Sequence, residues 1–236
     1  MVLAAGCVPE GPKTEGRAPP GSAGSRTAAA ERSPRAGPSS PPLLTAFEDR
    51  FERETLGGDY QVVGQGWRIV AGELCAEGAR NRGVWLRRSL PLNARIEFDA
   101  RSASPDGDIK AEAWGDGRSG ATGSSYSNAT SYLFILGGWK NTQHVLARLD
   151  EHGRDRLVLE VDRSSPDLQA QPVEPGQIYR FRIERSDGRT VAWSIDGRPV
   201  HELSDPEPLA GRGHDHFGFN DWMVRVCFDN LRATPL

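Results

Sequence analysis

Apolar and polar side chains alternate along most of the chain beyond residue 45. Between residues 178 and 185 apolar side chains alternate with charged ones, and the same alternation returns over 190–195 after Asp187-Gly188. Asp-Gly between two alternating runs is the strongest short-range signal of a β-hairpin. Because Asp196-Gly197 then leads into a third run at 199–203, we expect a three-stranded meander. Further strands are expected at 67–70, 84–88, 95–101, 109–114, 131–137, 144–150, 157–162 and 224–229.

About a dozen short strands separated by turn signals, with no helical crossovers between them, predict an all-β fold. The arrangement that fits this pattern is an antiparallel two-sheet β-sandwich, or jelly roll. No internal repeat is visible in the sequence, so a propeller is not indicated.

The alternating pattern is missing from the start of the chain. In residues 8–42, 24 of the 35 positions are Pro, Gly, Ser or Ala, and no aromatic residue precedes Phe47. Such a composition cannot bury enough apolar surface to fold. We therefore expect a disordered tether at 8–42 and one folded domain at 43–236.

The first seven residues end in Leu3-Ala4-Ala5-Gly6-Cys7 and resemble a bacterial lipobox. That resemblance implies that residues 1–7 are the remnant of a lipoprotein signal, with a lipid anchor on Cys7. Val8 follows the cysteine where Asp would signal inner-membrane retention, so the expected location is the cell envelope, at the outer membrane of a Gram-negative bacterium. Only six residues precede Cys7, too few for the charged and apolar parts of a signal peptide. Either the true start lies upstream, or the match is an accidental one on a cytoplasmic protein.

The formal net charge is −3 at pH 7, and there is no basic stripe with interleaved aromatic residues. Nucleic acid is therefore not expected as a partner. No Gly-rich phosphate loop precedes a helix, so a nucleotide is not expected either. No apolar run approaches the roughly 18 residues of a membrane-spanning helix.

The order of features from residue 45 to 236 resembles the concanavalin A-like lectin/glucanase superfamily, and within it the laminin-G-like and keto-disaccharide-hydrolase-like bacterial members. The resemblance implies two face-to-face sheets of six or seven strands, with carbohydrate bound on the concave face or at its rim. The segments that carry it are 47–51, 67–74, 83–86, 95–99, 179–200 and 226–231.

Retaining glucanases of this superfamily carry Glu-x-Asp-x-Glu on one strand, which places three carboxylates on one face. The only comparable run here is Glu97-Phe98-Asp99-Ala100-Arg101. An arginine cannot donate a proton at neutral pH. That mechanism is therefore not encoded in this run, which reads better as the polar face of a strand.

Three other residues are candidates for acid or base catalysis. Glu112 stands beside Trp114, and an aromatic neighbour can raise the pKa of a carboxyl group. Lys110 on the same face is expected to oppose that rise. The other two candidates for acid or base catalysis are Asp150, at the end of the strand expected at 144–150, and His152, just after it.

A sugar site needs an exposed aromatic platform flanked by planar hydrogen-bonding groups. The segment 137–142 supplies Trp139 and Asn141 after two glycines, and His144 and Arg148 share a face of the following strand. The alternative is a loop whose tryptophan packs on the edge of the sandwich. A second loop-like segment, 211–222, together with strand 109–114, offers lesser contributors: Asn220, Trp222 and Trp114.

The superfamily resemblance implies a structural calcium ion between the first and last strands, for which Asp49 and Asp229 are the matching positions. No other cofactor is required. By alternation Cys75 and Cys227 both point away from the core. Because early and final strands are neighbours in many jelly rolls, an oxidising compartment would allow a surface disulfide between them; two free thiols are the alternative.

These observations favour a cell-envelope lipoprotein whose β-sandwich binds carbohydrate without cleaving it. The first alternative is a glycoside hydrolase or a related carbohydrate-active enzyme. The second is a structural or adhesion lipoprotein of the surface that binds a protein partner.

Overall fold

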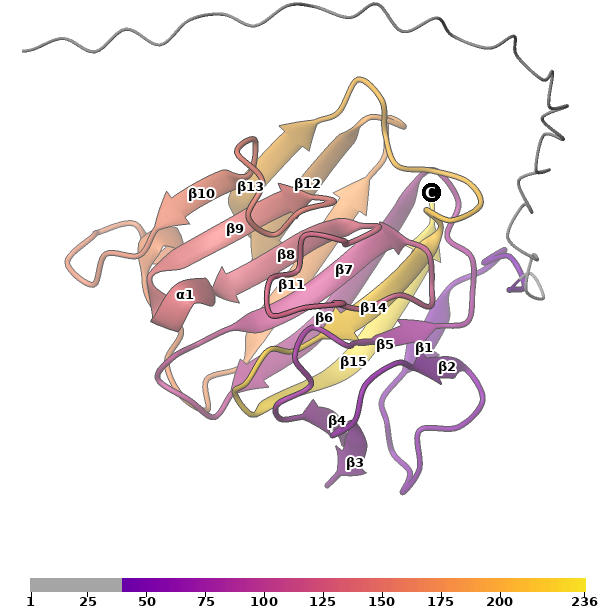
Figure 1. The fold of residues 1–236 in the computed structure, drawn as a ribbon, viewed down its shortest axis with the longest axis horizontal. Helices are drawn as coiled ribbons and strands as arrows, with labels where there is room; N and C mark the ends of the chain where they lie inside the picture. The colour runs from indigo at the N-terminus through magenta and orange to yellow at the C-terminus, as the bar shows by residue number, and fades with distance from the viewer. Residues whose placement is uncertain (1–39) are drawn as a thin grey trace, which may run out of the picture. The chain divides into compact units, whose positions relative to one another are not determined.

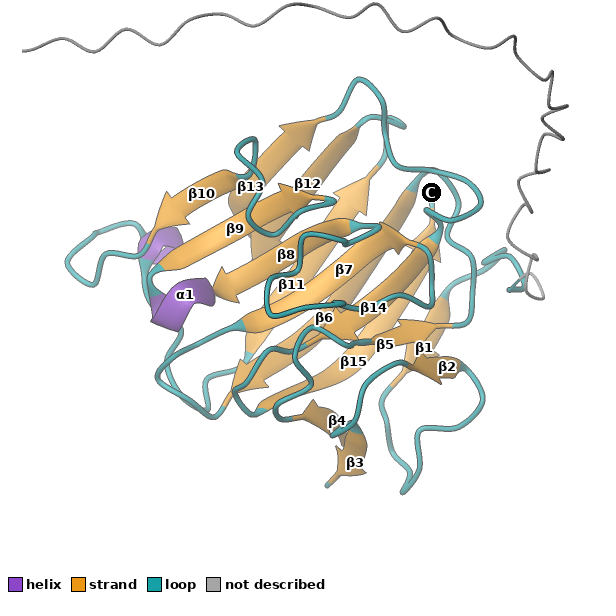
Figure 2. Cartoon of the chain, in the orientation of Figure 1, coloured by secondary structure: helices purple, strands orange, loops and turns teal. Residues whose placement is uncertain are grey.

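The computed structural model describes residues 40–236, and in this part the chain forms fifteen strands in two antiparallel sheets (Figures 1 and 2). The expected two-sheet β-sandwich is confirmed. The predicted tether up to residue 39 and the predicted lipidation of Cys7 lie outside the described residues. No helix in the described part is long and apolar enough to cross a membrane.

The two sheets are built from alternating stretches of the chain. The eight-stranded sheet has the order β13-β12-β11-β6-β15-β4-β3, with β1 also paired to β15, and the seven-stranded sheet has the order β10-β9-β8-β7-β14-β5-β2. The eight-stranded sheet comprises β1 (Phe47–Asp49), β3 (Arg68–Val70), β4 (Glu73–Ala76), β6 (Ala94–Ser102), β11 (Tyr179–Arg185), β12 (Thr190–Ile195), β13 (Arg198–Ser204) and β15 (Val226–Pro235). The seven-stranded sheet comprises β2 (Tyr60–Val62), β5 (Val84–Leu86), β7 (Ile109–Gly115), β8 (Tyr132–Gly137), β9 (Gln143–Arg148), β10 (Leu157–Glu160) and β14 (His216–Asn220). One helical turn, α1 (Gly138–Asn141), joins β8 to β9, and a short 3₁₀ turn spans Leu168–Ala170.

The predicted meander is confirmed as β11, β12 and β13, joined by two tight turns. In the first turn Asp187 accepts hydrogen bonds from the backbone N–H groups of Arg189 and Thr190, at 2.8 and 2.6 Å. In the second, Asp196 and Gly197 both have positive φ angles, 51° and 75°. Positive φ at both central residues is what a type I′ hairpin turn requires, and Asp-Gly satisfies it at low cost.

The segment 211–222 was expected to be a loop, and that expectation is wrong for its second half. His216–Asn220 forms β14, which lies between β7 and β5. Phe217 and Phe219 point into the core, while Gly218 and Asn220 face the other way. The period of two was present in the sequence, but glycines and polar residues around it obscured the strand.

The core between the sheets is centred on phenylalanines from both sheets. Phe98 of β6 stacks on Phe181 of β11 with ring centroids 4.7 Å apart. Across the sandwich it meets Phe217 and Phe219 of β14, the latter edge-on at 5.1 Å. Phe219 in turn stacks on Phe228 of β15 at 4.3 Å. Offset and edge-to-face contacts of this kind add to the burial of apolar area, so these rings hold the two sheets together.

Cys75 and Cys227 lie directly opposite each other on β4 and β15 and are joined by a disulfide bond. Both point away from the core, but they are buried and not at the surface as expected. A carboxylate oxygen of Glu73 lies within 4.8 Å of both sulfur atoms. Glu73 is ion-paired to Arg101 of β6, so this ion pair crosses β15, the strand that carries Cys227.

We expect Phe98→Ala to lower the free energy of unfolding by about 3–5 kcal/mol, because truncating a fully buried aromatic ring leaves a cavity between the sheets. Urea unfolding followed by tryptophan fluorescence measures this loss. Leu44→Ala is the matched control, since Leu44 is 79% exposed and its loss should change stability by no more than about 0.5 kcal/mol. A loss below 1 kcal/mol for Phe98→Ala would contradict the central place of this ring.

Candidate active site

β7 is the middle strand of the seven-stranded sheet, with β8 on one side and β14 on the other. Ala111 and Ala113 face the core, and Lys110 and Glu112 project from the opposite face, which we call the outer face of this sheet. Every residue of β7 is buried, on both faces. Two charged side chains are therefore enclosed at the centre of the outer face.

Trp114 does not join Glu112 on the outer face, and its expected role in a ligand site is wrong. The pairing register between β7 and β14 shifts between His216 and Phe217, and Trp114 has a positive φ of 55°. This bulge turns the indole into the core, where Nε1 donates a hydrogen bond to the Pro91 carbonyl at 3.1 Å. The guanidinium of Arg185 lies 4.0 Å from its ring centroid.

The outer face is covered by the loop 116–131, which connects β7 to β8 and crosses in front of the strands in Figure 1. The Trp85 indole donates to the Ser119 carbonyl at 2.9 Å, which helps to hold the loop down. Three loop residues pack on the outward side chains of β8 and β9 and form a second apolar cluster: Ala121, Tyr126 and Ala129 against Leu133, Ile135, Val145 and Ala147.

Glu112 lies beneath this loop and is 1% exposed. Its carboxyl group receives hydrogen bonds from the hydroxyl of Ser131 at 2.5 Å, from the hydroxyl of Tyr126 at 3.1 Å and from the amide of Asn220. Burial raises the pKa of Glu112 to about 7, although these three donors pull it downward, and the charge of Asp116 adds to the rise. Close to neutral pH, Glu112 therefore carries a proton for much of the time.

Asp116, in contrast to Glu112, is ionised at neutral pH. Partial burial raises its pKa, but hydrogen bonds from the Ser119 hydroxyl and from the backbone N–H groups of Ser119 and Arg118 outweigh this and lower the pKa below its ordinary value. Two interacting carboxyl groups, one protonated and one ionised, are the arrangement that acid–base catalysis uses.

Lys110 was expected to oppose the raised pKa of Glu112, and this expectation is wrong. Its ammonium group lies 3.2 Å from Glu151 and 3.5 Å from Asp108, and it donates to the Asn81 amide oxygen at 3.1 Å. Burial lowers the pKa of Lys110, but these two carboxylates outweigh it, so the lysine stays charged. The charge of Lys110 is thus neutralised by its own partners.

Asp221, directly after β14, extends this polar layer. Burial raises its pKa to about 7, partly offset by a 2.9 Å hydrogen bond that its Oδ2 accepts from the backbone N–H of Ala79. Its Oδ1 has no hydrogen-bond partner among residues 40–236. Lys110, Glu112 and Asp221 together form one enclosed polar layer on the outer face.

The residues expected to bind sugar do not come together in one site. Trp139 packs on the outer apolar cluster, with the Arg156 guanidinium 4.8 Å from its ring centroid. His144 faces the interior: its Nδ1 accepts from the Gly137 N–H at 2.9 Å and its Nε2 bonds to the Gln171 carbonyl at 3.0 Å. Burial lowers the pKa of His144 to about 4, so the ring is neutral.

The other four candidates have different surroundings. Asn141 is buried and ties the Val173 backbone to the helical turn α1. Arg148 is ion-paired to Asp205 at 2.7 Å. Asn220, expected at a ligand rim, is fully buried against Glu112, and Trp222 is half-buried beyond the end of β14.

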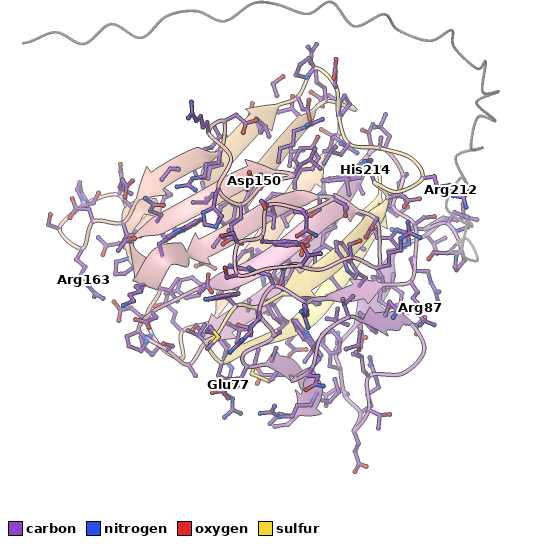
Figure 3. All side chains as sticks on the ribbon, viewed as in Figure 1. Glu77, Arg87, Asp150, Arg163, Arg212 and His214 are labelled. Atoms are coloured by element: carbon purple, nitrogen blue, oxygen red, sulfur yellow. A yellow bond between two sulfur atoms is a disulfide. The ribbon has the colours of Figure 1, made fainter. Side chains whose placement is uncertain are left out.

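Asp150 and His152 lie on the turn after β9, where Asp150 is labelled in Figure 3. The Asp150 carboxylate accepts a hydrogen bond from the His152 backbone N–H at 2.9 Å, and His152 is exposed. Neither side chain makes a hydrogen bond to Glu112. Of the three catalytic candidates, the structure therefore places only Glu112 in an environment suited to acid–base chemistry.

The implied calcium site does not fit Asp49. Its carboxylate accepts hydrogen bonds from the Arg53 guanidinium, from the Tyr60 hydroxyl and from the backbone N–H of Phe51, so its oxygens are already used and its charge is neutralised. Asp229 bonds instead to the backbone N–H of Asn230. The metal-ligating side chains that gather in threes within residues 40–236 are only Glu73, Cys75 and Cys227, and both cysteines are in the disulfide.

Three residues that affect the pKa of Glu112, namely Asp116, Tyr126 and Ser131, were missed because they lie in an irregular segment. Tyr126 and Ser131 belong to the loop 116–131, and Asp116 stands out in the sequence only as an acidic turn residue. Periodicity can place a side chain on a strand face, but it says nothing about a loop that returns across that face.

No protein-family model and no curated protein matches this chain. Among solved structures, the Crh5 transglycosylase in complex with NAG aligns with a TM-score of 0.58 at 10% identity, over 85% of this chain and 88% of that chain. A Bacillus licheniformis beta-glucanase aligns with a TM-score of 0.54 at 10% identity, over 81% and 99%. The alginate lyase Aly36B aligns with a TM-score of 0.51 at 11% identity, over 83% and 98%.

These comparisons overturn the expectation of a sandwich that binds carbohydrate without cleaving it. The similar structures include a transglycosylase, a glucanase, a lyase and an endo-acting O-glycanase of human gut bacteria, which agree better with the alternative of a carbohydrate-active enzyme. A Bacillus subtilis protein of unknown function with a galectin-like fold is also among them. At identities of 9–14% the likeness concerns the fold. The chain shares the two-sheet antiparallel β-sandwich fold of these structures, which is the fold that the superfamily resemblance implied.

Proposed function

We propose that the protein is a carbohydrate-active enzyme of the glycoside hydrolase class, and that its reaction centre lies on the outer face of the seven-stranded sheet. The observation that carries this proposal is Glu112: a carboxyl group at the centre of that face, enclosed by neutral hydrogen-bond donors, with its pKa raised to about 7. The similarity of the fold to that of glucanases and transglycosylases supports the same conclusion.

A general acid for glycoside cleavage has to hold a proton at the working pH and release it to the oxygen that leaves. Protonated Glu112 donates that proton to the glycosidic oxygen while the bond from the anomeric carbon to this oxygen breaks. The positive charge that develops on the sugar is stabilised by a carboxylate, and Asp116 is the ionised carboxylate that interacts with Glu112. Water then adds to the anomeric carbon through its oxygen and gives one proton to the Glu112 carboxylate, which completes the hydrolysis and restores the acid.

Access to Glu112 requires the loop 116–131 to move. The loop is anchored on the sheet by Tyr126 and by two alanines, while residues 122–125 are exposed. Loops that close over reaction centres exclude water and open on the microsecond to millisecond timescale. In this proposal the loop is such a cover, and Tyr126 links its position to the protonation of Glu112.

The cell-envelope location and the lipid anchor on Cys7 remain proposals. The disulfide between Cys75 and Cys227 supports them, since disulfides form and persist in oxidising compartments outside the cytoplasm. The substrate in this setting is an extracellular or envelope polysaccharide.

We expect the purified protein to release reducing ends from at least one member of a panel of soluble β-glucans, chitooligosaccharides and mucin glycans. Glu112→Gln keeps the shape of the side chain but removes the proton donor, so kcat/KM should fall by about 10²–10⁴. Asp116→Asn should also reduce it. Glu202→Gln, on the exposed edge of β13, is the matched control and should leave the rate unchanged. Equal rates for Glu112→Gln and the unaltered protein would refute the assignment.

Tyr126→Phe tests how the covering loop tunes the acid. The Tyr126 hydroxyl donates to Glu112 and lowers its pKa, so its removal should raise the pKa of Glu112 further. The basic limb of the kcat/KM profile, which reports the acid in the free enzyme, should then move to higher pH. A drop in rate without a shift of that limb would mean that Tyr126 only packs.

The pH dependence of stability tests the protonation of Glu112 independently of activity. In the unfolded chain its pKa is about 4.3, and in the folded protein about 7, so between these values the folded state keeps a proton that the unfolded state releases. The stabilisation is complete below about pH 4 and is lost as the pH rises through 7. Glu112→Gln lacks this loss.

Relative to the unaltered protein, Glu112→Gln should therefore gain about 3 kcal/mol of stability between pH 4 and pH 8. Urea unfolding at both pH values measures the difference. A difference that stays constant with pH would mean that Glu112 ionises normally.

A further inference from the structure

A cavity lies on the side of the seven-stranded sheet that faces away from Glu112. It has a volume of about 310 Å³ and opens at one end of the sandwich. Its walls come from β8 and β9 on one sheet, from β11, β12 and β13 on the other, and from the segment 168–177. Because Glu112 projects from the outer face, while this cavity lies between the sheets, the two places are separate.

The inner wall of the cavity is apolar. Leu136 and Ile195 belong to the core between the sheets, and Val173 and Val200 continue the same surface towards the opening. His144 adds a ring that is neutral and whose two nitrogens are already bonded, to Gly137 and Gln171. This wall therefore offers an apolar contact and no acid or base.

The rim of the cavity carries polar groups that have unused hydrogen-bonding capacity. The Tyr179 oxygen accepts a hydrogen bond from the Glu174 N–H at 2.7 Å, which leaves its own hydrogen free to donate. The side chains of Gln177 and Arg198 make no hydrogen bond or ion pair within the described part of the chain, and both are exposed. Asp196 uses one carboxylate oxygen, which accepts from the Arg180 N–H, and keeps the other available.

The charges around the opening nearly cancel. Arg198 and Asp196 carry opposite charges, and Glu174 is paired with Arg163 at 2.9 Å. A phosphate or carboxylate ligand would find no cluster of cations here. An acyl chain would leave the amide, hydroxyl and guanidinium groups without partners, which is costly once they are desolvated.

A ligand that fits both the apolar inner wall and the polar rim has one apolar face and neutral hydroxyl groups around its edge. A pyranose ring has this chemistry, and a cavity of about 310 Å³ has room for one ring and its ordered water. An apolar wall with a few convergent polar groups at its rim is also the usual make-up of a small-molecule site. We infer that this cavity binds a single neutral glycosyl residue, separately from the reaction centre proposed on the outer face.

The test is a titration of the full chain with glucose, galactose, mannose, xylose and N-acetylglucosamine, followed by ¹⁵N–¹H NMR. At least one of these sugars should shift the amide signals of Gln177, Gly197 and Arg198, with a Kd on the order of 1 mM. Gln177→Ala and Arg198→Ala, which change exposed side chains and leave the core intact, should each weaken binding about tenfold. Val200→Trp should block the cavity.

Two variants separate this inference from the proposed function and from general surface effects. Arg212→Ala changes an exposed arginine far from Arg163 (Figure 3) and should leave binding unchanged. Glu112→Gln should lower kcat/KM by about 10²–10⁴ but keep sugar binding, so either proposal can fail without the other. The inference is overturned if no sugar shifts these signals at 50 mM, if the shifts survive Val200→Trp, or if decanoate occupies the cavity and the sugars do not.

Discussion

The burial of β7 on both faces is the constraint on which the rest of this molecule depends. One face belongs to the phenylalanine core between the sheets, and the other lies beneath the loop 116–131. A charged side chain enclosed in this way has to be paired or to lose its charge. Lys110 takes the first route, through Glu151 and Asp108, and Glu112 takes the second, because its donors are all neutral.

The two sides of the seven-stranded sheet consequently have different chemistry. The outer face holds an enclosed polar layer around Glu112. Burial raises the pKa of Glu112 and destabilises the folded state when this group is ionised, and raised pKa values of this kind are typical of functional sites. The inner side, at one end of the sandwich, holds an open cavity with an apolar wall and a polar rim. The first arrangement suits proton transfer and the second suits binding. A protein that acts on a polymer can use both, since the polymer can be held at one place and cleaved at another.

Much of the fold could be predicted from local pattern alone. The meander β11–β13 was readable because Asp187-Gly188 and Asp196-Gly197 separate three alternating runs. Strand β14 could not be predicted in the same way, because glycine and polar residues around Phe217 and Phe219 obscure the alternation. Glu112 could be placed on a strand face beside Lys110, but the bulge that turns Trp114 into the core could not be foreseen. A bulge depends on the register with a partner strand that is about 100 residues away in the chain.

The sequence by itself determined the all-β architecture and the outward direction of Glu112, because these follow from side-chain periodicity, which is a local property. Only the tertiary structure decided which carboxyl group holds a proton, which cysteines meet, and which predicted ligand residues are buried. Those outcomes depend on desolvation and on hydrogen bonds from Tyr126, Ser131 and Asn220. These partners are 14, 19 and 108 residues away from Glu112, and no periodicity in the sequence connects them.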